Sequence, residues 1–351
     1  MKLRLLATLA ALSPLAHAQS PAPVAAAGNA RAFRHQPLIQ HLYTADPSAH
    51  VFEGKLYLYP SHDVPGVTDR TDGNHYAMRD YHVFSLDDVG GKVTDHGIVL
   101  KLEDIPWASR QLWAPDAAYS NGRYYFYFPA RDKQGVFRIG VATGDSPAGP
   151  FKPEPQPMDG AFSIDPAVYR DDDGAFYFYV GGIGGGQLQL WPGNRYTPDA
   201  VEPAGDNPAI APRVARLRPD MLGLAEELRE VQILDESGKP ITAGDTQRRF
   251  FEGCWIHKHN GTYYLTYSTG TTHLLCYATG SSPYGPFTYR GVLLKPVQGW
   301  TTHQSIVKWK DKWHLFYHDS QLSGESNLRN VKVAELHHNP DGTIETIDPF
   351  K

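Results

Sequence analysis

The chain has 351 residues and a formal net charge of -5, so nucleic acid and acidic membrane surfaces are not expected as partners. Aliphatic and aromatic residues make up 41% of it, which is enough for a sizeable core. Aromatic residues alone reach 12%, and the 20 Tyr and 15 Phe suit β-strands better than helices. The 33 Gly and 28 Pro indicate many turns.

The first residues have the pattern of a secretory signal peptide. A basic start is followed by a short apolar run over 5–15 and by Ala-His-Ala at 16–18, which fits a small-x-small cleavage site. We predict a signal peptide over 1–18, an unstructured Pro- and Ala-rich spacer over 19–34, and a secreted or periplasmic protein. A buried first helix is the alternative, and the shortness of the apolar run argues against it. No later stretch is long and apolar enough to cross a bilayer.

One aromatic phrase recurs five times along the chain. Each copy starts at or beside a polar or Gly turn and continues as an aromatic-rich strand. The copies read GKLYLY at 54–59, GRYYFY at 122–127, GAFYFY at 174–179, GTYYLTY at 261–267 and DKWHLFY at 311–317. A short apolar strand precedes every copy, so each unit begins with a hairpin.

Five such units predict an all-β protein, a five-bladed β-propeller over 35–351. A β-sandwich is also built from short strands and turns, but the five-fold recurrence favours the propeller. The charged segment over 203–246 is partly helix-like at 220–230, and we interpret it as a long insertion before the fourth blade.

The two cysteines, Cys254 and Cys276, are expected on the first and third strands of one sheet. Two strand spacings of ~4.8 Å separate them by about 9.6 Å. A disulfide needs Cα atoms within roughly 7 Å. We therefore predict two buried free thiols.

An acidic or imidazole side chain stands just before the first strand in four of the five units. These residues are Asp46, Asp165, Glu252 and His303, eight or nine positions before the turn; the second unit has Ala114 there. The innermost strands of a propeller line its channel, so equivalent positions meet at the channel mouth. Clustered buried carboxylates are costly, which indicates a role in chemistry or cation binding. Asp-Pro is also a common turn start, which is the alternative for Asp46 and Asp165.

Two carboxyl groups with distinct roles are the usual minimum for glycoside hydrolysis. One protonates the leaving oxygen, and the other activates water or attacks carbon. A separation of ~6.5–9.5 Å predicts inversion, whereas ~5–5.5 Å predicts retention. Carboxylates on opposite sides of a channel suit the wider gap.

From about residue 35 onward the chain resembles glycoside hydrolase family 43, the five-bladed propeller enzymes that cut xylose- and arabinose-containing polymers. The resemblance rests on TADPSAHVFEGKLYLYPSHD at 44–63, RQLWAPDAAYSNGRYYFYFPARD at 110–132, SIDPAVYRDDDGAFYFY at 163–179, RRFFEGCWIHKHNGTYYLTYSTG at 248–270 and GWTTHQSIVKWKDKWHLFYHDS at 299–320. It is strongest to the single-domain β-xylosidase and α-L-arabinofuranosidase members.

The resemblance implies a role for each acid. Asp46, in ADP, would be the general base that activates water; Glu252, in FFEG, the general acid; and Asp165, in SIDP, the residue that orients the acid and raises its pKa. His303, in TTHQS, matches the channel histidine that in many members helps to hold a calcium ion or its waters. Calcium prefers oxygen ligands, so one His would act beside waters. A hydrogen-bonded core histidine is the alternative.

Five further residues are candidates for sugar contact. Trp113 stands beside the channel position of the second blade, where it would stack on a sugar face or pack between blades. Arg329 matches an arginine that the family's last blade points at a sugar hydroxyl, and an exposed loop arginine is the alternative. His273, after STGTT, is a candidate for facing the centre. His62 and Asp63 follow the first aromatic strand and would line the pocket wall or belong to a solvated loop.

Together these patterns predict an inverting exo-acting glycoside hydrolase that releases terminal β-D-xylose, α-L-arabinofuranose or both from plant hemicellulose oligosaccharides. The segment 203–246 is expected to wall the channel into a pocket, which favours exo action. The rivals are a non-catalytic sugar-binding propeller, an endo-acting arabinanase or xylanase of the same fold, and a retaining, fructan-acting propeller. Three acids at one place favour an enzyme, and the choice between xylose and arabinofuranose stays open.

Overall fold

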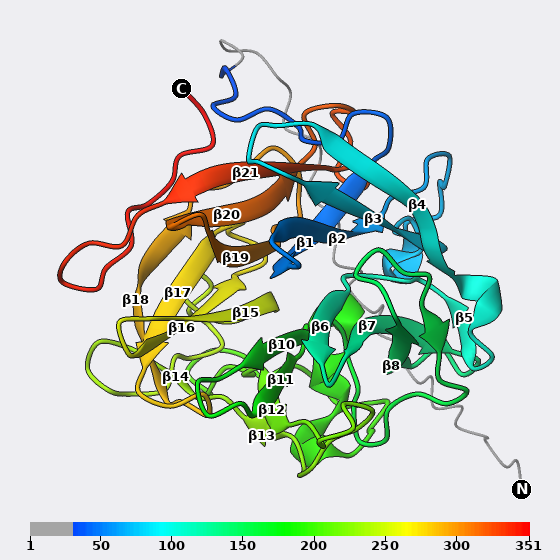
Figure 1. Cartoon of the computed structure of the whole chain (residues 1–351). Coiled ribbons are helices and arrows are strands. Elements are labelled where there is room, and N and C mark those ends of the chain that lie inside the picture. Colours follow the sequence, from blue (N-terminus) through cyan, green and yellow to red (C-terminus); the bar gives the residue numbers. More distant parts are fainter. Residues whose placement is uncertain (1–30) are drawn as a thin grey trace, which may run out of the picture. The chain divides into compact units, whose positions relative to one another are not determined.

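The computed structural model describes residues 31–351, so the predicted signal peptide and the spacer up to residue 30 lie outside the described residues. Within the described part, five sheets are arranged around a centre (Figure 1). The predicted all-β, five-bladed propeller is confirmed. No helix among these residues is long and apolar enough to cross a membrane.

The strands follow the predicted order, and every predicted hairpin is present as the first two strands of a blade. Blade 1 contains β1 (Thr44–Phe52), β2 (Lys55–His62), β3 (Asp80–Leu86) and β4 (Val93–Lys101). Blade 2 contains β6 (Asp116–Ser120), β7 (Arg123–Asp132), β8 (Phe137–Gly144) and β9 (Lys152–Pro153), with β5 (Ala108–Arg110) at the far end of β7. Blade 3 contains β10 (Ala167–Arg170), β11 (Phe176–Val180), β12 (Arg213–Arg216) and β13 (Arg229–Glu230).

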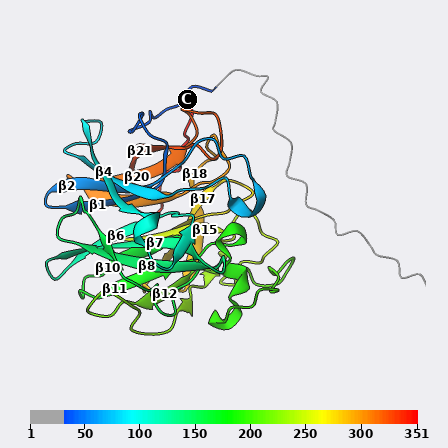
Figure 2. The same ribbon diagram turned by 90° about the vertical axis from the view of Figure 1, so that its right-hand side faces the viewer.

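Blade 4 contains β15 (Glu252–His259), β16 (Thr262–Ser268), β17 (Leu275–Gly280) and β18 (Phe287–Leu294), with β14 (Ile233–Leu234) added in parallel to β18. Blade 5 contains β19 (Gln304–Trp309), β20 (Lys312–Asp319) and β21 (Asn330–Leu336). The helical elements are short 3-10 turns, η1 (Thr71–Gly73), η2 (Leu102–Asp104), η3 (Gly184–Gly186), η4 (Leu188–Leu190) and η5 (Pro192–Asn194). Figure 2 shows η1 and the η3–η5 region on one side of the disc.

The segment 203–246 differs from its prediction. It has no helix at 220–230; the structure has turns there, followed by the short strand β13. Strands β12 and β13 complete blade 3, and β14 extends blade 4, so the segment is partly blade rather than wholly insertion. Its charged residues mimicked a helix because turns and edge strands also place polar side chains at short intervals.

The recurring aromatic phrase ties each blade to the next. Tyrosines at one equivalent place in the second strand of blades 1, 2 and 3 donate to a backbone carbonyl of the following blade. The pairs are Tyr59–Pro147 at 2.7 Å, Tyr127–Met221 at 2.9 Å and Tyr179–Pro283 at 2.5 Å. The aromatic ring fills the space between blades while its hydroxyl is satisfied, which explains the Tyr-rich composition.

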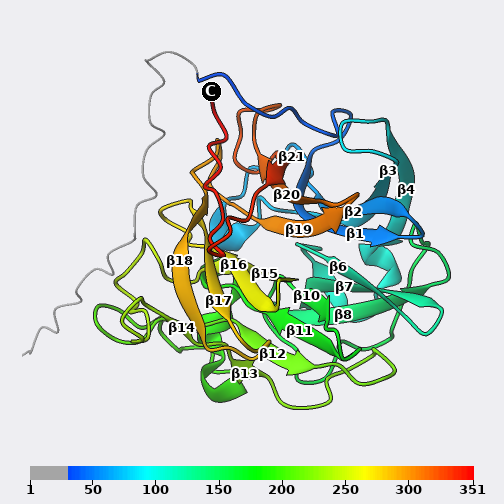
Figure 3. The same cartoon turned by 60° about the vertical axis from the view of Figure 1, so that its left-hand side comes forward.

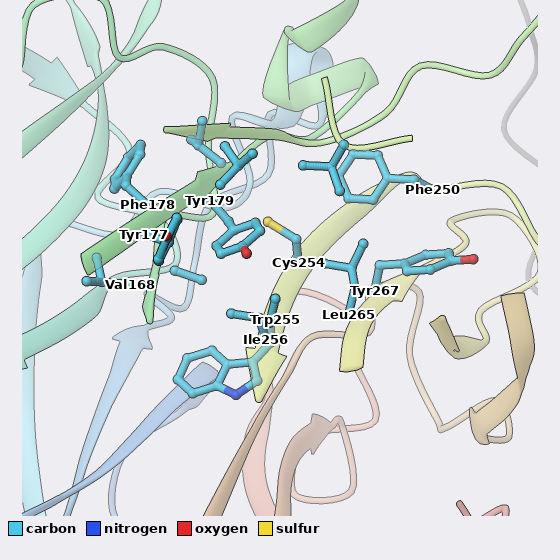
Figure 4. Packing of buried hydrophobic residues seen from close by; sticks show 14 of the residues in the cluster. Val168, Tyr177, Phe178, Tyr179, Phe250, Cys254, Trp255, Ile256, Leu265 and Tyr267 are labelled. Atoms are coloured by element: carbon cyan, nitrogen blue, oxygen red, sulfur yellow. The ribbon is translucent and has the colours of Figure 1, made fainter. Parts of the chain in front are cut away.

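The interface between blades 3 and 4 shows how the core is built. Figure 4 shows Tyr179 of β11 beside Cys254 of β15, with Trp255 and Leu265 close by. In the described part of the chain both Cys254 and Cys276 are buried free thiols, as predicted. Their strands, β15 and β17, are separated by β16.

The ring closes where the last blade meets the first. Figure 3 shows β19 next to β1, and these two strands are in contact. The start of the folded unit joins the same seam, because Phe33 bridges to Phe350 and Arg34 N donates to Pro349 O. The compact unit accordingly begins at Phe33, two residues before the expected start. The seam brings the blade 5 side chain Arg329 against blade 1.

Candidate active site

The channel position of each blade has a specific backbone conformation. Strand pairing shifts register between Ala45 and Ser48 in β1 and between Glu252 and Trp255 in β15, which marks a β-bulge in each. Asp46 lies at the first bulge with φ of 49°. A left-handed residue other than Gly costs about 1–2 kcal/mol, so local contacts must compensate for this conformation. The bulge turns the Asp46 carboxylate toward the channel.

Counting back from the turns sharpens the predicted register. The two-residue turns after Phe52 and after His259 are equivalent, which puts Gly253, and not Glu252, opposite Asp46. Gly253 has φ of 67° and Asp165 has φ of 59°, as at the same place in blade 1. Glu252 therefore reaches the site from one residue earlier.

Asp46 is buried and held from three sides. Arg329 Nη1 donates to its Oδ1 at 2.9 Å, and Ser61 Oγ donates to its Oδ2. The Asp46 backbone N–H donates to His318 Nδ1 at 3.0 Å. Burial alone would raise the pKa of Asp46, but the Arg329 charge, His318, His303 and the Ser61 hydrogen bond lower this pKa to about 2. Asp46 is therefore an ionised carboxylate at neutral pH.

Arg329 is the cation of the site. It forms a bidentate pair with Asp63, from Nε to Oδ2 at 2.9 Å and from Nη2 to Oδ1 at 2.8 Å. Both side chains are buried, and Nη1 is left to bind Asp46. Arg329 is thus not an exposed loop residue. Asp63 was expected in the pocket wall or a solvated loop; instead it is a buried partner that orients Arg329.

Asp165 and Glu252 have the opposite electrostatic setting. Burial, the Glu252 charge and the Asp46 charge raise the pKa of Asp165 well above its usual range, against one hydrogen bond of 2.8 Å from the Gly253 N–H. Burial and then the Asp46 charge raise the pKa of Glu252 to about 8. This pair therefore retains a proton at neutral pH. Glu252 is the more exposed of the two.

His303 lies between the two carboxylate groups. Its Nδ1 is 3.8 Å from Asp46 Oδ1 and 3.8 Å from Asp165 Oδ2, beyond direct hydrogen-bond distance. Burial lowers the pKa of His303, so the ring is neutral at neutral pH. The side-chain oxygen of the next residue, Gln304, is buried and has no hydrogen-bond partner within residues 31–351. A neutral imidazole between two carboxylates fits a water-coordinated cation.

Glycine makes room for the acid beside β15. A side chain at Gly182 would meet Ile164 Cδ1 at 2.6 Å and Glu252 Cβ at 3.2 Å. The loop containing Gly182 follows β11, and Gly182 N donates to the hydroxyl of Ser163 at 3.0 Å. This close approach packs the loop against the backbone that carries Asp165 and Glu252.

Aromatic side chains surround these carboxyl groups. The indole N–H of Trp113 donates to Tyr76 O at 2.8 Å, and the Tyr76 ring lies 5.0 Å from the Arg329 guanidinium. On the blade 4 side, His273 Nδ1 donates to Trp300 O at 2.6 Å. Trp300 is 39% exposed and packs edge-on against Phe251, the neighbour of Glu252. Trp113 and Trp300 are the indoles placed to meet a sugar face.

The prediction for His62 is wrong. Successive side chains of a strand point to opposite faces, and Ser61 and Asp63 both face the Asp46–Arg329 pair. His62 therefore points to the other face of β2, where its Nδ1 donates to Asp80 Oδ1 at 2.7 Å. It contributes nothing to the channel wall.

Sequence reasoning missed four residues of the site, Ser61, Tyr76, His318 and Trp300. Ser61 and His318 could have been found, since they end the second strands of blades 1 and 5 at equivalent places. Counting forward from each turn, as was done backward for the acids, leads to both. Tyr76 and Trp300 lie in loops outside the repeat, where no register applies.

The arrangement combines an ionised carboxylate with a carboxyl pair that keeps its proton. One group can accept a proton from water while the other donates one to a leaving oxygen, which is the chemistry of glycoside hydrolysis. Fold and site together define a propeller glycosidase.

The chain belongs to glycosyl hydrolases family 43, whose pattern its residues 35–344 match. Its relatives agree. It is 58% identical over 309 residues to a xylosidase/arabinosidase of Bacteroides ovatus, covering 87% of this chain and 95% of that protein. It is also 58% identical over 324 residues to xylosidase/arabinosidase 43A of Humicola insolens, covering 89% and 99%.

Solved structures show the same fold. A family 43 β-xylosidase/α-arabinofuranosidase from a compost microbial metagenome, in complex with xylotriose and in a calcium-free form, has a TM-score of 0.89 and 59% identity, covering 92% of this chain and 99% of that one. A family 43 enzyme of Xanthomonas citri complexed with xylotriose has a TM-score of 0.87 and 58% identity, covering 91% and 95%. The chain is thus a glycosidase, and a non-catalytic propeller is not favoured.

Proposed function

We propose that this protein is an inverting, exo-acting hydrolase that releases terminal β-D-xylose, α-L-arabinofuranose or both from hemicellulose oligosaccharides. The observation that carries the proposal is the divided protonation of the site. The pKa of Asp46 is held at about 2 while that of Glu252 is raised to about 8, so base and acid coexist at neutral pH. Relatives named xylosidase/arabinosidase and complexes with xylotriose support the substrate class.

In this mechanism Asp46 accepts a proton from the attacking water. Arg329 and Ser61 hold the carboxylate, so its orientation toward the water is fixed before substrate binds. Glu252 gives its proton to the leaving oxygen. Asp165 acts through Glu252, because its buried carboxyl favours retention of the proton by the pair.

The stereochemical test follows the first-formed product. Proton NMR of xylose released from a β-xyloside should show the α-anomer before mutarotation, because water attacks from the face opposite to the leaving group. First appearance of the β-anomer would refute the inverting scheme and favour a retaining mechanism.

A substrate panel resolves the sugar and the mode of attack. β-xyloside and α-L-arabinofuranoside chromogens should both be cleaved, and xylo-oligosaccharides should shorten by single residues from one end. Release of internal fragments from polymeric xylan would replace exo with endo action. Trp113→Ala and Trp300→Ala test the two indoles, and an increase in KM with little change in kcat identifies sugar stacking.

We further propose that His303 takes part in holding a calcium ion through the ion's waters. Such an ion supplies positive charge between the carboxyl groups when bound. Calcium titration of chelator-treated protein by calorimetry should give one site that is lost in His303→Leu. Unchanged calcium binding in that variant would exclude His303.

Export is a separate proposal from the first 18 residues. Expression in a bacterial host with cell fractionation should place the protein outside the cytoplasm, with a mature N-terminus after Ala18. An intact Met1 on the purified protein would overturn it.

A further inference from the structure

A second cluster of ligand-type side chains lies on blade 1, on the face of β2 that points away from the catalytic carboxylates. We call it the blade 1 histidine cluster; its members are His62, Asp80 and His82. His62 ends β2, and Asp80 and His82 stand two apart at the start of β3, so both point to the same face of that strand. The established reaction uses none of them.

The cluster has the dimensions of a metal site. One ligand atom from each of its three residues lies within 4.8 Å of the other two. His62 Nδ1 and Asp80 Oδ1 are 2.7 Å apart, and the rings of His62 and His82 meet edge to face with centroids 5.2 Å apart. The side chains are 19%, 20% and 13% exposed, so an ion can reach them from solvent while the strands hold them in place.

A carboxylate behind the cluster orients one of its ligands. His82 Nδ1 donates to Asp95 Oδ1 at 3.0 Å, which leaves His82 Nε2 as the free ring nitrogen. Asp95 is fixed in turn by the Gly97 N–H at 2.7 Å and by His41 Nε2 at 2.8 Å. A histidine ligand backed by a carboxylate is the usual arrangement around protein-bound zinc.

We propose that the blade 1 histidine cluster binds a divalent transition-metal ion of the zinc class, with His62, Asp80 and His82 as ligands and water completing the coordination. Two imidazoles and one carboxylate suit zinc, cobalt or nickel, whereas calcium prefers oxygen ligands. The ion takes the place of the proton that His62 and Asp80 now share. This site is distinct from the channel position of His303.

Occupancy of this site bears on the catalytic side of β2. His62 stands between Ser61 and Asp63, which hold Asp46 and Arg329 on the opposite face of the strand. An ion that joins β2 to β3 through His62 therefore holds the strand end that carries both contacts. A ligand bound only by the native state also raises Tm in proportion to its excess over Kd.

The test uses tag-free, chelator-treated protein and the metals alone. Titration with Zn²⁺ by calorimetry should give one site, and Co²⁺ should give the visible absorption of a low-symmetry nitrogen- and oxygen-ligated ion. His82→Gln and Asp80→Asn should weaken binding by about 100-fold or more, and Asp95→Asn by about 10-fold. His96→Gln is the matched control, because His96 is a blade 1 histidine bonded to Ser85 outside the cluster.

Folding of each variant is checked by circular dichroism and by Tm without metal, so loss of binding is separated from loss of structure. Absence of saturable Zn²⁺ binding to the wild type overturns the proposal. So does binding that survives in His82→Gln, or binding that is lost in His303→Leu while His82→Gln retains it. Weakening in His82→Gln with full binding in His96→Gln supports it.

Discussion

The two sides of the channel handle the same chemical group in opposite ways. On the side of blades 1 and 5, Asp46 contacts the Arg329 guanidinium and is ionised. On the side of blades 3 and 4, Asp165 and Glu252 have only each other and one backbone N–H, and they keep a proton. The difference shows that the cation, and not burial, decides which carboxyl is the base, since burial raises the pKa on both sides.

Removing the ionised carboxylate should have the largest effect. Asp46→Asn cannot accept a proton from water, so kcat should fall by about 10²–10⁴-fold with little change in KM, measured on a chromogenic xyloside or arabinofuranoside. Asp171→Asn, a carboxylate bonded to Lys258 in the blade 3 turn, is the control and should keep wild-type activity. Near-normal turnover in Asp46→Asn would remove this residue from the mechanism.

Removing the cation should make the two sides alike. Arg329→Met leaves Asp46 and Asp63 buried without their partner, so the pKa of Asp46 should rise and the acid limb of kcat/KM should move up by about one pH unit or more. Stability should fall by about 3–5 kcal/mol in urea unfolding. Asp63→Asn keeps the charge beside Asp46 and should shift the limb less. Equal shifts in both variants would contradict this reading.

Removing one member of the proton-holding pair should move the other limb. In the wild type, activity should fall as pH rises through about 8, because Glu252 then loses the proton it must donate. Asp165→Asn removes a neighbouring acidic group, so the basic limb should move to lower pH with about a 10-fold loss of kcat/KM. An unmoved basic limb would show that Asp165 does not tune the acid.

The smallest effect concerns stability. The pKa of Glu252 is raised in the folded state, so its contribution is fully present below the unfolded pKa of 4.5 and is lost as pH rises through about 8. Glu252→Gln stays neutral and escapes this loss. Its Tm should match the wild type near pH 4.5 and exceed it by about 2 °C near pH 8 in scanning calorimetry. A constant difference across this range would argue against a raised pKa.

Much of the fold could be predicted because the propeller repeats itself. The aromatic phrase marks the second strand of every blade, and counting back from its turn led to Asp46, Asp165 and His303 without any structure. The same count erred by one residue at Glu252, since the bulge at Gly253 is a matter of backbone dihedrals. Segment 203–246 has no repeat, so its strands were taken for an insertion.

What the sequence alone determined was therefore periodic: five blades, two free thiols, and the acids that stand at equivalent places. The tertiary structure decided what each charged group faces. Arg329 and Asp46 lie 283 positions apart, and only ring closure brings them to 2.9 Å. His62 and Asp63 are adjacent in the chain, yet strand alternation sends one to a histidine cluster and the other to the active-site arginine. Protonation depends on such long-range contacts, which a local pattern does not contain.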